Sequence, residues 1–192
     1  MPDGWQTKSG DGALGDYIEW EGQNSFNQPG NGLIPIRVAI SSPGTYQFIW
    51  RSSIREGTST TDANDSWLRI HSDNYYGVKN SQATPVCPNE QLSTNRCNGR
   101  SPNGSSSDGW FKIYRSGGVA GDWQWRALTS DNDGHIILAD FDRVGEYLIE
   151  ISGRSRGHAI DRLVLFRSRN SDNNVTEDFA TDAARRESEV AP

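Results

Sequence analysis

The segment HAIDRLVLF, residues 158–166, decides the fold class of this chain. Its apolar residues, from Ile160 to Phe166, predict a buried β-strand, because β-branched and aromatic side chains fit a pleated sheet. Two charged residues, Asp161 and Arg162, interrupt this apolar run. A core strand needs only its apolar side chains, so Asp161 requires a separate explanation.

Segments of the same kind occur throughout the sequence before residue 158, with turn residues between them. They are DYIEWEG (16–22), LIPIRVAI (33–40), TYQFIWRSS (45–53), DSWLRIHS (65–72), GWFKIYRS (109–116), DWQWRALT (122–129), GHIILADF (134–141) and DRVGEYLIEISGRS (142–155). With the final strand they make roughly nine short strands and no convincing helix, a pattern typical of this class of fold. The sequence therefore predicts an all-β domain, a β-sandwich or jelly roll.

The composition fits one domain with a core of its own. The 192 residues include 20 Gly, 8 Pro and 7 Trp, and they carry a net charge of −6. An acidic chain lacks the basic face that phosphate contact needs, so nucleic acid is excluded as an expected partner. No apolar run approaches the roughly 20 residues of a membrane span, so we expect no membrane insertion. The N-terminal sequence has no signal-peptide pattern. We expect a monomeric module, covalently linked to other domains of a larger protein.

The order of the segments suggests three parts. Residues 1–13 are predicted to be an N-terminal extension, residues 14–167 the sandwich, and residues 168–192 a polar linker or tail. Within the sandwich, residues 72–108 read as a long insertion, and loops of this length are usually functional or disordered.

The insertion contains the two cysteines of the chain, Cys87 and Cys97, among Pro, Asn, Ser and Gly residues. A disulfide that clips such a loop is the preferred interpretation, and it implies an oxidising, extracellular compartment. The alternative is a pair of free thiols in a cytosolic loop. Two cysteines with no nearby histidine supply only half of a zinc site.

Carboxylates form the first candidate site. Glu19 and Glu21 are two residues apart, so both side chains face the same side of a strand. Asp161 would join them if the first and last strands pair. Three carboxylates with backbone carbonyls suit calcium, whereas the plainer reading is two glutamates that face solvent on an edge strand.

Aromatic residues form the second candidate site. Trp123 shares a strand face with Trp125, while Tyr75, Tyr76 and Trp110 lie in or beside the insertion. Aromatic rings stack on the apolar faces of sugars, although each tryptophan could equally belong to the core. Adjacent tyrosines on one strand point to opposite faces, so Tyr75 and Tyr76 are not both expected to point inward.

Polar residues near strand ends complete the candidates. Asn64 and Asp65 precede a strand that contains Trp67, and Arg154 lies in the turn before the last strand. Ligand contact competes here with backbone hydrogen bonding for Asn64 and Asp65, and with ion pairing for Arg154. Catalysis finds little support, because the sequence has no nucleophile elbow and no His-rich metal motif. Paired glutamates on one strand lie side by side, whereas a glycoside hydrolase needs them on opposite walls.

Together these motifs resemble the galactose-binding-like β-sandwich of carbohydrate-binding modules related to families 6 and 35. The resemblance covers about residues 14–167, without most of the insertion. The motifs that carry it are Glu19-x-Glu21, Pro43-Gly44-x-Tyr46 followed by Arg51, Asn64-Asp65-Ser66-Trp67, Trp123-x-Trp125, Gly145-x-Tyr147-x-Ile149-x-Ile151-x-Gly153-Arg154, and Ile160-Asp161-Arg162-Leu163-Val164-Leu165.

The resemblance implies a non-catalytic module that targets a larger secreted bacterial protein to a polysaccharide or oligosaccharide. It implies a structural calcium ion held by Glu19, Glu21 and Asp161, which would explain the charged residue in the last strand. It also points to sugar binding by aromatic residues at one end of the sandwich or on a concave face. The alternatives are a calcium-stabilised adhesion or structural module of a surface protein, and a polysaccharide-degrading enzyme domain.

Overall fold

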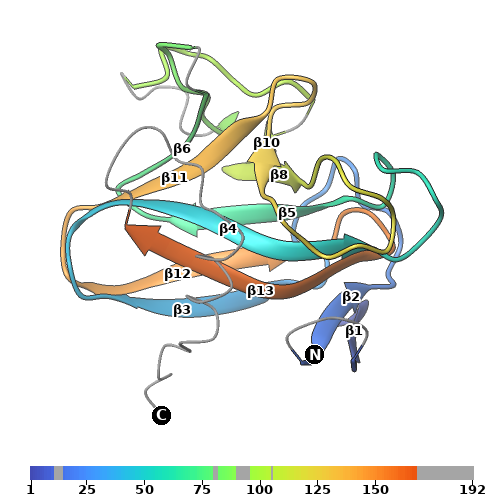
Figure 1. Ribbon diagram of the computed structural model, residues 1–192. Helices are drawn as coiled ribbons and strands as arrows, with labels where there is room; N and C mark the ends of the chain where they lie inside the picture. Colours follow the sequence, from blue (N-terminus) through green and yellow to red (C-terminus); the bar gives the residue numbers. More distant parts are fainter. Residues whose placement is uncertain (11–14, 80–81, 90–95, 105, 168–192) are drawn as a thin grey trace.

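The computed structural model describes residues 1–10, 15–79, 82–89, 96–104 and 106–167 (Figure 1). This part of the chain forms thirteen strands. They are β1 (Trp5–Lys8), β2 (Tyr17–Trp20), β3 (Ile34–Ile40), β4 (Gly44–Ile54), β5 (Asp65–His71), β6 (Asn74–Val78), β7 (Ser106–Ser107), β8 (Trp110–Tyr114), β9 (Gln124–Trp125), β10 (Leu128–Thr129), β11 (His135–Phe141), β12 (Gly145–Ser152) and β13 (His158–Arg167). The predicted tail lies outside the described residues.

The strands form one curled antiparallel sheet that folds into two layers. The hydrogen-bonded order is β1-β2-β13-β4-β11-β10-β8-β5-β12-β3, and β6, β7 and β9 add to β11, β8 and β4. The short strand β10 joins the layer around β4 to the layer around β5. The structure therefore confirms the all-β prediction, and its layers agree with a sandwich or jelly roll. Several loops that connect the strands gather at one end of the sandwich, on the right in Figure 1, which we call the loop end.

The segment HAIDRLVLF lies in β13, as predicted. It pairs with β4 from His158 opposite Ile54 to Arg167 opposite Tyr46. The register shifts between Ile160 and Arg162, so Asp161 occupies a bulge in this long ladder. The predicted pairing of the first acidic strand with the last strand is also present, because β2 pairs with the start of β13.

Both layers contribute to one apolar core. Its fully buried side chains include Phe48 and Trp50 from β4, Leu68 from β5, and Ile137 from β11. Aromatic contacts run through the core, and the rings of Phe48 and Trp50 meet at 5.6 Å. Burial of these large side chains supplies the main driving force for closing the sheet.

The insertion begins with a strand of the sheet, which the sequence did not predict. Strand β6 pairs with β11, and its two tyrosines do face opposite sides. However, Tyr75 is 0% exposed in the main core, and Tyr76 is 4% exposed in a second cluster with Cys87, Cys97 and Leu138. The two tyrosines therefore point to opposite faces, as expected, but both are buried, because residues of the insertion cover the second face of β6.

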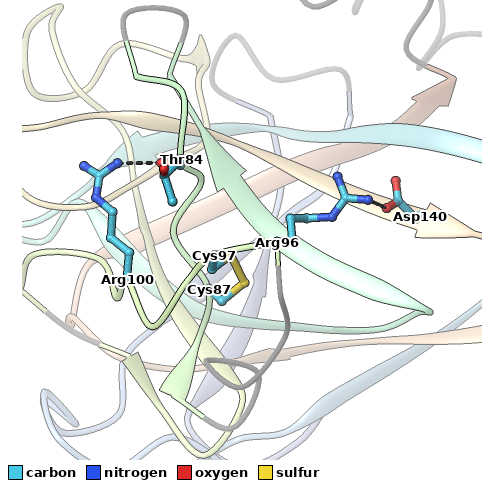
Figure 2. The surroundings of a disulfide bond; sticks show 6 residues. All are labelled: Thr84, Cys87, Arg96, Cys97, Arg100 and Asp140. Atoms are coloured by element: carbon cyan, nitrogen blue, oxygen red, sulfur yellow. Dashed lines mark hydrogen bonds and ion pairs between the residues drawn. A yellow bond between two sulfur atoms is a disulfide. The ribbon is translucent and has the colours of Figure 1, made fainter.

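The predicted disulfide between Cys87 and Cys97 is present (Figure 2). Beside it, the Arg96 guanidinium donates to the Asp140 carboxylate at 2.8 Å and lies over the Tyr76 ring at 4.3 Å. Arg100 donates to the Thr84 carbonyl at 2.6 Å. Burial and the Asp140 charge raise the pKa of Tyr76 to about 12, so its hydroxyl stays protonated and donates to Asp140. These contacts fasten the described part of the insertion onto β6 and β11.

Part of the predicted N-terminal extension belongs to the sheet. Residues Trp5–Lys8 form β1, which pairs with β2, and Trp5 is 2% exposed. The ring of Trp20 packs edge to face on Trp5 at 5.3 Å. Residues 5–8 therefore belong to the domain, whereas residues 11–13 lie outside the described part.

Four glycines surround Trp20. They are Gly4, Gly22, Gly32 and Gly153. A Cβ atom at any of them would lie closer than 3 Å to a Trp20 ring atom, a separation that packed side chains do not tolerate. The absence of side chains here lets three separate segments approach the indole.

We expect Gly153→Ala to destabilise the domain by about 3 kcal/mol, because the added methyl group must displace the buried Trp20 ring. Gly145→Ala is the matched control. Gly145 also has an ordinary backbone conformation, and the nearest atom to its added Cβ would lie 4.0 Å away. Urea unfolding of both variants measures the difference. Equal stabilities would contradict the close packing around Trp20.

A buried histidine marks the start of β13. His158 is 0% exposed, and its Nδ1 lies 2.8 Å from the Ser66 hydroxyl. Burial, with a smaller contribution from the Arg115 charge, lowers the pKa of His158 to about 3. The folded domain therefore holds this imidazole neutral, whereas the unfolded chain protonates it below about pH 6.5.

This difference predicts a loss of stability in acid. The contribution of His158 is complete above about pH 6.5 and is lost as the pH falls toward 3, by about 1.4 kcal/mol per pH unit. We expect His158→Gln to flatten the pH dependence of the free energy of unfolding by that slope. Urea titrations between about pH 6.5 and pH 4 test this. Parallel pH profiles for the two proteins would contradict a neutral buried His158.

Candidate functional site

Of the four aromatic residues predicted to bind ligand, the structure leaves one partly exposed. Tyr75, Tyr76 and Trp110 are 0%, 4% and 4% exposed, so their rings are packing residues in this structure. Trp123 is half-buried and lies just before β9 at the loop end of the sandwich. Of the predicted aromatic residues, only Trp123 therefore has a ring that is accessible to a ligand in this structure.

Trp123 belongs to a cluster of two aromatic rings and two guanidinium groups, which we call the aromatic–arginine cluster. Its members are Tyr17, Arg51, Arg55 and Trp123. The Tyr17 and Trp123 rings meet edge to face at 5.1 Å. The Arg55 guanidinium lies 4.8 Å from the Trp123 ring and 5.1 Å from the Tyr17 ring, and Arg51 lies 5.2 Å from the Trp123 ring. All four residues are partly exposed.

Two strands and one loop bring these residues together. Tyr17 begins β2. Arg51 lies near the end of β4, and Arg55 directly follows this strand; β13 lies between β4 and β2. Trp123 ends the loop that follows β8. The alternation of side chains along β2 and β4 fixes which of them reach this face.

A buried arginine holds the loop that carries Trp123. Arg115 is 0% exposed, and its guanidinium donates to the carbonyls of Gly117, Val119 and Asp122 at 2.7–3.2 Å. A guanidinium with several carbonyl partners fixes the loop path, because each bond restricts one peptide unit. The backbone next to Trp123 is therefore preorganised.

Asp161 fixes Arg51, the cluster member that lies on β4. Its carboxylate is 0% exposed and accepts from Arg51 at 2.8 Å and from Arg162 at 2.7 Å. The bulge in β13 places this carboxylate between the two guanidinium groups. Asp161 therefore has a reason to interrupt an apolar strand, since it fixes the Arg51 side chain that packs on Trp123.

The predicted polar ligand-binding residues form a buried network instead of a surface. Asp65 is 3% exposed and accepts from Arg154 at 2.7 Å and from the Ser155 hydroxyl at 2.6 Å. The Asn64 amide donates to the Arg115 carbonyl at 3.0 Å. These residues hold the turn before β13 and the end of β8, so their structural role explains their position.

The three carboxylates that the resemblance assigns to calcium have different surroundings. Glu21 pairs with Lys8 at 2.5 Å, and Asp161 pairs with two arginines. Burial, opposed in part by Lys8, raises the pKa of Glu19. Among the described residues there is no group of three or more His, Cys, Asp or Glu side chains that could hold a metal ion. The calcium site that the resemblance implies stays a prediction, and two of its three carboxylates already have cationic partners.

The cluster includes residues that the sequence did not identify as candidates. Tyr17, Arg51 and Arg55 each lie in or just after a predicted strand, but nothing in their spacing relates them to Trp123. Arg51 does follow the Pro-Gly-x-Tyr motif, and it binds Asp161, the carboxylate whose place in an apolar strand the sequence left unexplained. The charge of Asp161 was therefore the feature of the sequence that could have led to Arg51.

Comparisons with known proteins do not assign the chain to a family, since no protein-family model, no curated protein and no solved structure matches it. Within the described residues, no helix is long and apolar enough to cross a membrane.

We expect EDTA to leave the melting temperature of the domain unchanged, because Lys8, Arg51 and Arg162 already neutralise two of the three candidate carboxylates. A ligand that binds only the folded state raises the melting temperature with its concentration. The test is to measure the melting temperature by thermal unfolding in the presence of EDTA, calcium or magnesium. A rise in melting temperature that calcium alone produces would contradict this expectation and support the calcium site implied by the resemblance.

Proposed function

We propose that this domain is a non-catalytic carbohydrate-binding module that targets a larger secreted bacterial protein to a polysaccharide. The observation that carries the proposal is the aromatic–arginine cluster at the loop end. There, the one partly exposed aromatic residue of those predicted meets a second ring and two fixed guanidinium groups. Rigid aromatic anchors with a few convergent polar groups are the usual composition of a small-ligand site.

The cluster supplies two kinds of interaction. The exposed parts of the Tyr17 and Trp123 rings offer apolar contact to the C–H groups of a sugar. Arg51 and Arg55 present planar N–H donors, which suit hydroxyl and carboxylate oxygens. Because Asp161 and the neighbouring rings hold these side chains, little conformational entropy is lost on binding.

A single site of this size gives modest affinity. Linkage to other modules of the same parent protein would raise the effective concentration at a polymeric ligand. The disulfide is consistent with the oxidising environment that a secreted protein meets.

The burial of Tyr75, Tyr76 and Trp110 favours a second candidate, an adhesion or structural module of a surface protein. In that function these aromatics serve only to pack the sandwich and its insertion. The two candidates differ in whether substitution of Trp123 changes glycan binding.

We expect Trp123→Ala to weaken polysaccharide binding by at least about tenfold, which corresponds to about 1.4 kcal/mol, because it removes the central ring of the cluster. Affinity electrophoresis in gels that contain plant and algal polysaccharides measures the retardation. Val144→Ala is the control, since Val144 is exposed in the turn between β11 and β12. If no polysaccharide retards the wild-type domain, the adhesion or structural module is the better function.

A further inference from the structure

A polar hollow lies at the loop end, outside the aromatic–arginine cluster. Its volume is about 730 Å³, within the range of small-ligand sites. It is bounded by Asp3 and Gly4 of the N-terminal segment, by Trp20, and by the loop between β2 and β3. Neither Tyr17 nor Trp123 lines it, so the hollow is a separate surface.

The side chains that line the hollow are mostly amides. Gln23, Asn27 and Gln28 are exposed, and their side chains make no hydrogen bond to any other residue that the structure describes. An amide group donates and accepts hydrogen bonds, as a sugar hydroxyl does. When they bind a ligand, these three side chains therefore give up no hydrogen bond to the described part of the chain.

The hollow also contains an aromatic ring. Phe26 is 48% exposed, and it is the only aromatic residue among the exposed large hydrophobic residues of the described chain. The Arg154 guanidinium lies 5.1 Å from the Phe26 ring and 5.1 Å from the buried Trp67 ring. Since Asp65 holds Arg154, the phenyl ring rests on a fixed support.

Three buried indole groups fix the backbone of the loop. The N–H groups of Trp5, Trp20 and Trp67 donate to the carbonyls of Gly32, Gln23 and Ser25 at 2.7–3.1 Å. The Ser25 amide donates to the Arg154 carbonyl at 2.7 Å. The loop is therefore rigid in its main chain while its amide side chains remain available, which lowers the entropic cost of binding.

From this arrangement we infer that the hollow is a second saccharide-binding site, selective for neutral oligosaccharides. The phenyl ring provides a stacking face, and the amides provide hydrogen bonds to hydroxyl groups. Asp3 is the one ionisable side chain in the lining, and its negative charge disfavours an anionic sugar. The choice of ligand rests on the proposed function, but the site does not share residues with the aromatic–arginine cluster.

Nuclear magnetic resonance tests the inference through the side-chain amide signals of Gln23, Asn27 and Gln28. The probes are cellohexaose, xylohexaose, laminarihexaose and mannohexaose at millimolar concentrations, with triglycine as a peptide probe. We expect one of the saccharides to shift these signals. Phe26→Ala should weaken that binding about tenfold, and Phe26→Trp should retain it. Trp123→Ala should leave it unchanged, which separates this site from the cluster.

Asn27→Ala provides a second variant at an exposed position that has no packing role. It should weaken binding of the same saccharide without a change in the melting temperature. The inference fails if no saccharide shifts the three amide signals, if triglycine shifts them in place of a saccharide, or if binding is lost in Trp123→Ala and kept in Phe26→Ala. The last result would support the proposed function while overturning the second site.

Discussion

The packing of Trp20 is the constraint on which the loop end depends. Its ring lies against four glycines from the N-terminal segment, the β2–β3 loop and the turn after β12. Its indole N–H donates to the Gln23 carbonyl. Such close packing leaves one arrangement of these segments, because a packed interior does not deform continuously. The edge strand β1 is held in part by this contact, since Trp5 packs on the same ring.

Buried arginine and aspartate side chains also fix the segments at the loop end. Arg115 binds three carbonyls of one loop, while Arg154 and Asp65 join the turn before β13 to the start of β5. Removal of either guanidinium would leave buried carbonyl or carboxylate oxygens without a donor, so these positions tolerate few replacements. Arg115 and Arg154 are therefore internal supports of the fold rather than surface charges.

The sequence allowed most of the sandwich to be predicted, because alternation of apolar and polar residues reports one buried face. It did not reveal that β6 is buried on both faces, since Tyr76 is covered by cysteines and an arginine from the later part of the insertion, where no periodic pattern predicts their position. Strand β1 was missed because four residues are too few for a periodic signal. Glu19 lies in β2 and Glu21 follows directly after this strand, but their spacing could not show that Lys8 pairs with Glu21.

The same reasoning explains why the sequence marked Asp161 as a residue that needs a partner but did not identify Arg51 as that partner. A charge inside an apolar strand is visible in the sequence, as is the adjacent Arg162, whereas the second guanidinium that binds Asp161, that of Arg51, lies 110 residues away on β4. Calcium and arginine both satisfy a buried carboxylate, and only the three-dimensional arrangement distinguishes them.

In the loop between β2 and β3, the core fixes the backbone, whereas the amide side chains remain exposed. Indole, hydroxyl and peptide groups of the core bind the carbonyls of residues 23–32, so the path of the loop does not depend on the identity of its exposed amides. The structure therefore permits Gln23, Asn27 and Gln28 to change with little cost in stability. Specificity at such a surface is free to vary while the sandwich beneath it stays constant, which is the property expected of a scaffold that presents binding residues on loops.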